Sequence, residues 1–199
     1  MEIQFLEWLQ TLHTDYLDTF MRSVTALGNV AIFWVLLTIV LLIVPKTRLT
    51  GLSMAIALAL TAFTGEQILK PLIARPRPFV AAGFEELIVS KPTSWSFPSG
   101  HTTAAFTTAL TLCYYHRKAG IAALLLAALI AFSRMYLFVH YPTDVLGGIC
   151  LGALWSFLTV RVIRPRLDRK LAGTKAAKFF PGLPAAARSS AKSAQDSRP

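Results

Sequence analysis

The feature that most constrains this chain is that its apolar residues come in long blocks separated by short charged turns. Residues 26–44 contain no charged side chain, and as a helix they are long enough to cross a hydrocarbon core about 30 Å thick. Residues 51–69, 119–139 and 143–160 form three further blocks, each with a single charged residue toward one end. These blocks predict membrane-spanning helices.

A fifth block, residues 99–115, is shorter and richer in Thr and Ala, which predicts a buried central helix. The expected fold is therefore all-α, an integral-membrane bundle of about five transmembrane helices. The composition agrees, because 54% of residues are hydrophobic and only 15% are charged, whereas soluble domains are about 25% charged. A soluble globular enzyme is thereby disfavoured. A disulfide scaffold is excluded, since the two cysteines, Cys113 and Cys150, lie inside apolar blocks.

The two ends of the chain differ from its centre. Residues 1–25 carry apolar side chains at steps of three or four, which predicts an amphipathic helix lying in the membrane interface. A sixth span there is the less favoured alternative, because charges interrupt the apolar run. The segment does not read as a secretory signal, since its start is acidic. Residues 26–164 form the expected transmembrane domain, and residues 165–199 a basic tail, disordered from 187 onward.

The net charge of +10 is unevenly distributed. From Arg161 to the end, ten Lys and Arg residues face two Asp, and the turns around Lys46 and Arg117 are also basic. Basic flanks mark the cytoplasmic side of a membrane protein and attract anionic lipid. We therefore expect a multi-pass plasma-membrane protein with a cytoplasmic C-terminus and with residues 70–98 and 140–142 on the outer face. Nucleic-acid binding is disfavoured, because the tail lacks interleaved aromatic residues.

Ionisable residues at the apolar blocks gather toward the outer end of their helices. They are Glu66, Lys70, His101, Arg134, His140 and Asp144. Charged groups at membrane depth are costly, so they are normally paired or functional. Arg75 and Lys91, by contrast, are interpreted as side chains that extend to the lipid headgroups. Glu66 and Lys70, four residues apart, are expected to form a structural ion pair.

Three segments hold polar residues at fixed spacings. They are Lys70 with Arg77 and Pro78, the tetrapeptide Pro98-Ser99-Gly100-His101, and Ser133-Arg134 followed by His140 and Asp144. In order and spacing they resemble the signature of the type 2 phosphatidic acid phosphatase superfamily, over roughly residues 66–148. This family contains membrane lipid phosphatases and soluble vanadium haloperoxidases. Every signature residue is present.

The residues support phosphate chemistry without the resemblance. Ser99 and Gly100 begin a predicted helix whose free N–H groups can bind phosphate, and glycine permits close approach. Lys70, Arg77 and Arg134 can surround a phosphoryl group with positive charge. Neither a metal nor another cofactor is expected, because these cations neutralise the phosphate and the sequence contains no carboxylate cluster.

His140 and Asp144, four residues apart, share a helical face, so the carboxylate can hold one imidazole nitrogen and leave the other free. His101 can then protonate the leaving oxygen. The resemblance implies these roles: His140 forms a phosphohistidine, His101 is the acid, and the matching Lys, Arg, Ser and Gly hold the phosphate. The predicted catalytic residues are therefore His140, His101 and Asp144, and the predicted phosphate-binding residues are Lys70, Arg77, Ser99, Gly100 and Arg134.

The favoured function is hydrolysis of a lipid phosphate or diphosphate at the extracytoplasmic face. Short bacterial members that this chain resembles commonly act on undecaprenyl diphosphate. The alternatives are a phosphatidic acid or phosphatidylglycerophosphate phosphatase, or transfer of phosphate to another lipid. A haloperoxidase is disfavoured by the apolar spans. A transporter or scaffold is disfavoured because the inner halves of the spans are almost entirely apolar. The oligomeric state stays open.

Overall fold

The computed structural model of the chain describes residues 1–28, 31–84, 86–172, 174 and 179–180. Every regular element formed by these residues is a helix, which confirms the all-α prediction. The disorder predicted from residue 187 onward lies outside the described residues. The helices are α1 (Glu2–Gln10), α2 (Asp15–Leu27), α3 (Ile32–Ile43), α4 (Arg48–Ala62), the π-helical η2 (Phe63–Leu69), α5 (Lys70–Ile73), α6 (Pro78–Ala81), α7 (Gly100–Tyr115), α8 (Arg117–Tyr136), α9 (Pro142–Leu158), the π-helical η3 (Thr159–Ile163) and α10 (Arg164–Ala172).

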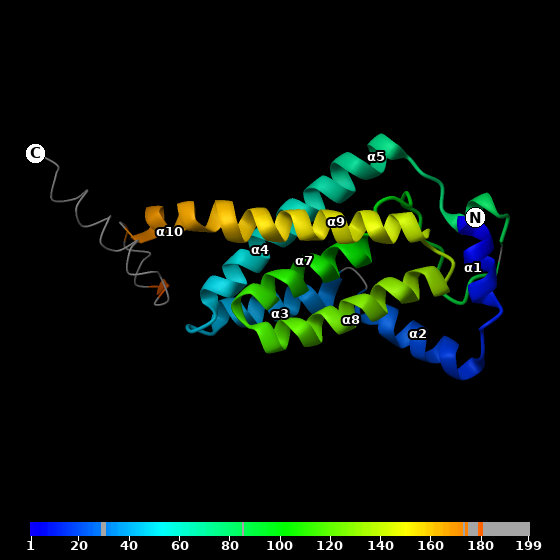
Figure 1. Cartoon of the computed structure of the whole chain (residues 1–199), viewed down its shortest axis with the longest axis horizontal. Coiled ribbons are helices and arrows are strands. Elements are labelled where there is room, and N and C mark those ends of the chain that lie inside the picture. The colour runs from blue at the N-terminus through cyan, green and yellow to red at the C-terminus, as the bar shows by residue number, and fades with distance from the viewer. Residues whose placement is uncertain (29–30, 85, 173, 175–178, 181–199) are drawn as a thin grey trace, which may run out of the picture.

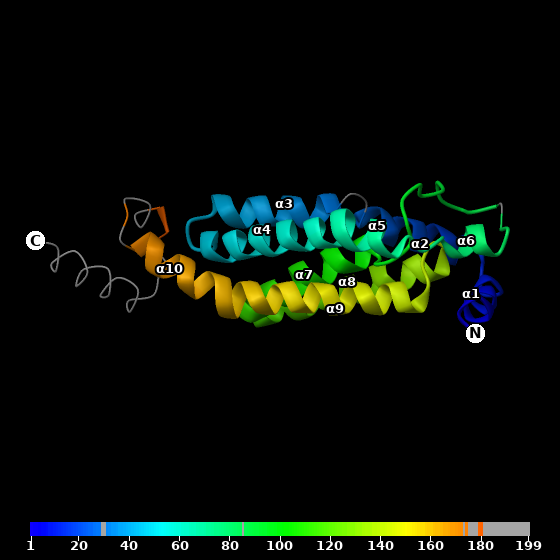
Figure 2. The ribbon, with the colours of Figure 1, turned by 90° about the horizontal axis from the view of Figure 1, so that it is seen from above.

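The helices form an elongated bundle with α1 and α10 at opposite ends (Figure 1). Seen from above, α3 and α4 run along one side of the bundle, and α8 and α9 run along the other (Figure 2). The α10 end carries basic residues from several elements. They are Lys46, Arg48, Arg117, Lys118, Arg161, Arg164, Arg166, Arg169 and Lys170. The α1 end carries the segments that hold the predicted site residues. The basic residues just listed and the predicted site therefore lie at opposite ends of the bundle.

Helix α7 is the centre of the bundle and packs against α8, α9 and α4. Its buried side chains are mostly Thr and Ala, small residues that let neighbouring helices approach closely. The Thr107 hydroxyl bonds to that of Thr61 at 3.1 Å, and the Thr111 hydroxyl donates to Ser156 at 3.0 Å. The prediction of a buried central helix is thus confirmed.

Among the described residues, three helical stretches are long and apolar enough to cross a membrane, namely Arg48–Ala81, Arg117–Tyr136 and Pro142–Ala172. A fourth is counted if α2 and α3, which bend by 43° relative to each other, form one span. The sixteen residues of α7 are about 24 Å long, which is less than a hydrocarbon core. A membrane-type helical bundle is therefore confirmed, whereas the number of five spans stays a prediction.

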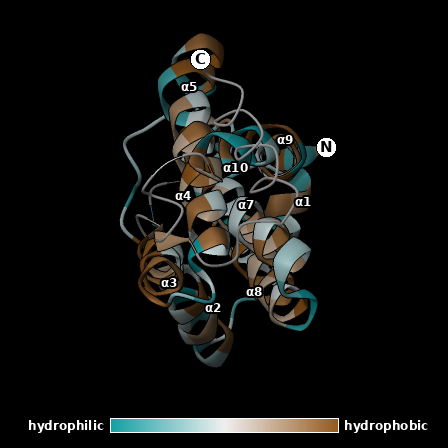
Figure 3. Cartoon of the chain, turned by 90° about the vertical axis from the view of Figure 1, so that its left-hand side faces the viewer, coloured by the Kyte–Doolittle hydropathy of each residue, from teal (hydrophilic) through white to brown (hydrophobic). Residues whose placement is uncertain are grey.

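The outer surface of the bundle is apolar, as lipid contact requires. In Figure 3 helix α3 is coloured mostly hydrophobic. Its Leu36 and Ile43 are 56% and 66% exposed, and Phe157 on α9 is 61% exposed. In water such a surface would aggregate, whereas a bilayer covers it.

The N-terminal segment differs from the single helix predicted for residues 1–25. It contains two helices, α1 and α2, and Thr14 caps the second by accepting from the Leu17 N–H at 3.3 Å. Leu6 and Leu9 are fully buried, because α1 docks onto a distant segment, residues 136–141, a contact that local periodicity does not reveal. The position of this segment in the membrane interface stays a prediction.

Candidate active site

A cavity of about 930 Å³ opens at the α1 end of the bundle. Among the residues that line it are six of the eight predicted site residues: Lys70, Arg77, Gly100, His101, Arg134 and His140. The other two, Ser99 and Asp144, have no exposed surface and lie directly behind this wall. Segments far apart in the sequence therefore meet at one cavity.

Lys70 stands where the π-helical turn η2 gives way to α5. Its ammonium donates to Glu66 at 2.8 Å and to the Ser94 hydroxyl at 3.3 Å, which confirms the predicted Glu66–Lys70 pair. Helix α5 ends at Ala74, whose φ of 44° is uncommon for a residue with a side chain. This left-handed residue reverses the chain and starts the extended segment that carries Arg75 and Arg77.

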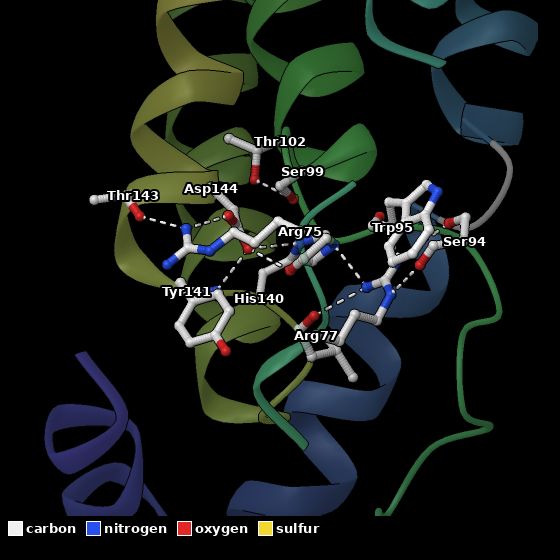
Figure 4. A network of polar contacts seen from close by, with 12 residues as sticks. Arg75, Arg77, Ser94, Trp95, Ser99, Thr102, His140, Tyr141, Thr143 and Asp144 are labelled. Atoms are coloured by element: carbon white, nitrogen blue, oxygen red, sulfur yellow. Dashed lines mark hydrogen bonds and ion pairs between the residues drawn. The ribbon is translucent and has the colours of Figure 1, made fainter. Parts of the chain in front are cut away.

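Arg77 links the loop after α6 to His140 (Figure 4). Its Nε donates to the Ser94 carbonyl at 2.7 Å, and one terminal nitrogen donates to the Val139 carbonyl at 2.9 Å. The same nitrogen lies 3.1 Å from Nε2 of His140. Because a guanidinium can only donate, Nε2 must carry a lone pair, and the ring proton must be on Nδ1.

Nδ1 of His140 faces Asp144, 3.4 Å from Oδ2. That oxygen also accepts from the Ser96 hydroxyl at 2.5 Å and from the Tyr141 N–H at 2.9 Å. Phe138, two residues before the histidine, is fully buried with a φ of 58°, so the turn that presents His140 is held in an uncommon conformation by its packing. This arrangement makes Nε2 the candidate nucleophilic nitrogen.

Burial lowers the pKa of His140 to about 3. The hydrogen bond to Asp144 acts in the opposite direction, and the nearby charges of Arg77 and Arg134 lower the pKa further. The imidazole is therefore neutral at physiological pH, and its Nε2 lone pair accepts from Arg77.

Arg134 supplies the third cation and is 5% exposed. One terminal nitrogen donates to the Thr25 hydroxyl of α2 at 2.6 Å. Its Nε is buried and finds no acceptor among the described residues. A buried donor without an acceptor is costly, so this guanidinium is arranged for a group that the chain does not supply. An anion in the cavity satisfies that need.

The start of α7 closes the remaining side of the cavity. A Cβ on Gly100 would lie 2.9 Å from Oε1 of Glu66 and 3.9 Å from Nζ of Lys70, so a side chain there would enter the space beside the cations. The Ser99 hydroxyl accepts from Thr102 at 3.0 Å, and its N–H donates to the Asp144 carbonyl at 3.1 Å. Because the first N–H groups of a helix lack intrahelical acceptors, this end of α7 suits an anion.

His101, the second residue of α7, lines the same cavity. A Cβ on Gly28 would lie 2.7 Å from its ring carbon Cδ2, so the absence of a side chain at Gly28 makes room for the imidazole. His101 therefore stands on the helix α7 wall, on a different element from His140, which suits separate roles for the two rings.

Four contributors to this site were not among the predicted residues. Ser94 and Ser96 lie in the irregular loop after α6, and Thr25 lies on α2, so no motif or periodicity marks them. Arg75 was interpreted as extending to the headgroups. The structure contradicts this, because Arg75 instead bonds to Asp144 Oδ1 at 2.7 Å and to Glu2 at 2.6 Å. The sequence feature that could have indicated a role for Arg75 is its position two residues before Arg77 in the same short segment.

The donor set of the site does not resemble a metal centre. Within residues 1–28, 31–84 and 86–172, no group of three or more His, Cys, Asp or Glu is arranged to hold a metal ion. The site presents cations to its cavity instead, and reaction without a metal stays a prediction.

A membrane-embedded helical bundle with an anion-binding, histidine-containing cavity defines the class of protein, and comparison with known proteins gives the family. The model of the PAP2 superfamily matches residues 46–168. The chain belongs to that superfamily, as a membrane phosphatase of the lipid-phosphate type. Helices α1 to α3 lie outside the matched region.

Curated relatives carry related names. An undecaprenyl-diphosphatase of Sulfolobus acidocaldarius is 37% identical over 130 residues, which cover 65% of this chain and 63% of that protein. The undecaprenyl-diphosphatase BcrC of Bacillus subtilis is 31% identical over 159 residues, covering 78% of this chain and 81% of the relative.

Solved structures share the fold. A transmembrane PAP2-type phosphatidylglycerolphosphate phosphatase from Bacillus subtilis superposes with a TM-score of 0.66 at 28% identity, covering 85% of each chain. LpxE of Aquifex aeolicus gives a TM-score of 0.65 at 27% identity, covering 80% of this chain and 94% of that one. Both neighbours are helical proteins of similar extent.

Proposed function

We propose that the protein hydrolyses a lipid diphosphate, of the polyprenyl diphosphate class, through a phosphohistidine formed on His140. The observation that carries the proposal is the position of His140, whose Nε2 bears a lone pair in a cavity lined by Lys70, Arg77 and Arg134. A neutral imidazole held among three cations suits phosphoryl transfer, because catalysis there rests on positioning and charge stabilisation.

In the proposed reaction the Nε2 lone pair of His140 attacks phosphorus, and the bond from phosphorus to the leaving oxygen breaks. That oxygen leaves with the bonding electrons and takes a proton from His101. Asp144 stabilises the positive charge that develops on the His140 ring. Water then attacks the phosphohistidine, His101 accepts a proton from that water, and breaking of the N–P bond releases inorganic phosphate and restores His140.

The shape of the cavity supports a lipid substrate. Beyond the polar residues, its wall continues along apolar side chains of α3 and α4, including Val35, Leu58 and Ala62. These helices face lipid on their outer side. A prenyl or acyl tail can lie along this wall while the headgroup reaches the cations.

A fourth cation supports a diphosphate over a monophosphate. Arg22, on α2 one turn before Thr25, lines the same cavity and makes no hydrogen bond or ion pair to another described residue. Lys70, Arg77 and Arg134 surround the phosphoryl group that is transferred, and Arg22 is free to contact the second one. The names of the undecaprenyl-diphosphatase relatives support the same choice.

We further propose that the site faces the outside of the plasma membrane. The basic residues named above lie at the α10 end, opposite the cavity (Figure 1). The positive-inside rule places that end in the cytoplasm, and with it the C-terminus.

The test is phosphate release by purified protein in detergent, with undecaprenyl diphosphate, phosphatidic acid and phosphatidylglycerophosphate compared in the presence of EDTA. We expect undecaprenyl diphosphate to be preferred, turnover to be unchanged by EDTA, and His140→Gln to release no phosphate. Arg22→Gln should lower kcat/KM for the diphosphate about tenfold and leave that for phosphatidic acid unchanged. Full activity of His140→Gln would refute the mechanism, and label appearing on an acceptor lipid would show transfer.

A further inference from the structure

Helix α1 lies across the segment that presents His140. Its Leu6 and Leu9 are fully buried and belong to the same apolar cluster as Phe138 and Val139. Its C-terminal residue Gln10 donates to the Tyr136 carbonyl at 2.9 Å. The helix thus covers the catalytic turn on the side away from the cavity.

At the other end of α1, Glu2 caps the start of α9. One carboxylate oxygen accepts from the Thr143 N–H at 3.0 Å and from the Thr143 hydroxyl at 2.8 Å. Partial burial of Glu2 acts to raise its pKa, but these bonds and the ion pair with Arg75 outweigh it, so the pKa lies below its usual value. Glu2 is therefore ionised at neutral pH, as a cap at the positive end of a helix should be.

The second oxygen of Glu2 is connected through Arg75 to Asp144, the partner of His140. It bonds to Arg75 at 2.6 Å, and Arg75 bonds to Asp144 Oδ1 at 2.7 Å. The guanidinium lies 3.8 Å above the ring centre of Tyr141 and donates to the Thr143 hydroxyl at 2.6 Å (Figure 4). Stacking and three hydrogen bonds, to Glu2, Asp144 and Thr143, fix the place of this side chain.

The two oxygens of Asp144 therefore have different partners. Oδ1 belongs to Arg75, whereas Oδ2 is left to the Ser96 hydroxyl, the Tyr141 N–H and Nδ1 of His140. A carboxylate held at both oxygens cannot rotate, and its remaining interaction selects the Nδ1–H tautomer of the imidazole. Arg75 and Glu2 are not among the described residues that line the cavity.

We propose that Arg75 and Glu2 are positioning residues, through which the N-terminal helix holds the Asp144 carboxylate and thereby the reactive tautomer of His140. The inference rests on the proposed function, since it presumes that His140 is the nucleophile. It assigns a catalytic purpose to a helix outside the matched family region. Because these two residues touch no substrate, they act on kcat and not on substrate binding.

The test uses Arg75→Gln and Glu2→Gln in the full-length protein, with Arg166→Gln as the matched control. Arg166 is exposed at the opposite end, where it bonds only to the Val162 carbonyl among described residues. We expect kcat to fall about 10- to 100-fold in Arg75→Gln and about threefold to tenfold in Glu2→Gln, with KM within twofold of wild type. The double variant should resemble Arg75→Gln, because both changes break one chain of contacts.

Two readouts separate positioning from a purely structural role. Guanidinium ion added to Arg75→Ala should restore kcat at least threefold, since Arg75 is partly exposed, whereas alkylammonium should not. The ring ¹⁵N resonances of His140, assigned by comparison with His140→Gln, should lose the single Nδ1–H tautomer in Arg75→Gln. That second readout needs no substrate, so it tests the inference even if the proposed reaction fails.

Unchanged kcat together with an unchanged His140 tautomer in Arg75→Gln would overturn the inference. So would losses of kcat that follow loss of folded protein in thermal unfolding and that guanidinium does not reverse. If Arg75→Gln fails to fold, Arg75→Lys and Glu2→Gln decide the question by the same two readouts.

Discussion

Each end of the bundle buries an arginine, and the two arginines differ in how completely their donors are paired. At the α10 end, Nε of Arg164 bonds to Asp168 at 2.6 Å, and a terminal nitrogen bonds to the Leu49 carbonyl at 2.7 Å and to Ser53 at 2.9 Å. At the cavity end, Arg134 has a single hydroxyl partner, Thr25, and its buried Nε has no acceptor among the described residues.

This contrast distinguishes Arg164, whose donors are satisfied by the protein, from Arg134, which keeps a donor for a ligand. Arg164 is neutralised by a carboxylate four residues away and joins the start of α10 to α4, so its donors are satisfied within the fold. Arg134 stands in a wall with Lys70 and Arg77. Burial is similar at both ends, with 4% and 5% of the arginines exposed, so the completeness of pairing is the informative difference.

The comparison is tested most strongly by replacing each arginine with methionine. We expect Arg134→Met to lower kcat/KM for phosphate release by about 100-fold or more, because it removes a cation from the transition state. Its stability should be unchanged or higher, since a buried cation without a carboxylate partner is lost. Arg164→Met should keep its activity while folded but lose about 3 kcal/mol of unfolding free energy, because Asp168 is left buried without its partner.

Both variants are measured by phosphate release and by thermal unfolding in the same detergent. The expected result is a crossed pattern, with activity lost at one end and stability at the other. A large loss of stability in Arg134→Met, with activity per folded molecule unchanged, would show that the cavity arginine is structural too.

The sequence predicted the parts of the site that local geometry encodes. His140 and Asp144 are one helical turn apart, and Gly100 begins a helix, so short spacings were sufficient to place them. The fold followed from the same kind of information, since uninterrupted apolar blocks predict helices in lipid and the Thr- and Ala-rich block predicted the central helix α7. That the three distant segments form one site could be expected only from their resemblance to a family signature.

What the sequence did not reveal depends on contacts between distant segments. Arg75 and Ser96 lie in irregular chain between helices, where no periodicity indicates which way a side chain points. Helix α1 buries Leu6 and Leu9 against the turn before His140, an arrangement decided by tertiary packing. Ion pairs such as Glu2 with Arg75 are likewise invisible until the fold brings the two residues together.

A smaller effect is expected from a glycine at the cavity. Gly100→Ala places a methyl group 2.9 Å from Oε1 of Glu66, so the carboxylate whose other oxygen accepts from Lys70 must shift. We expect kcat/KM to fall about tenfold, equivalent to about 1.4 kcal/mol, with thermal unfolding little changed. Gly65→Ala is the matched control, because its Cβ would make ordinary contacts of 3.6 Å to Leu151 and 3.9 Å to Pro98.

Equal rates for Gly100→Ala and Gly65→Ala would show that the space beside Lys70 is not needed by the substrate. The cavity end would then tolerate an added side chain as an ordinary packed helix does, and the contrast between the two ends would be weaker.

The smallest expected effect is the response of His140 to acid. A base acts in its neutral form and loses function as the pH falls through its pKa, so a pKa lowered from 6.5 to about 3 moves that loss out of the working range. In the ligand-free protein, the ring ¹⁵N resonances of His140 should therefore stay those of a neutral imidazole from pH 8 down to about pH 5. Because no substrate is added, ionisation of a substrate does not affect this measurement. Titration of His140 with a midpoint near 6.5 would mean that neither burial nor the cations Arg77 and Arg134 act on this ring as the structure indicates, and the contrast between the two ends would be weaker.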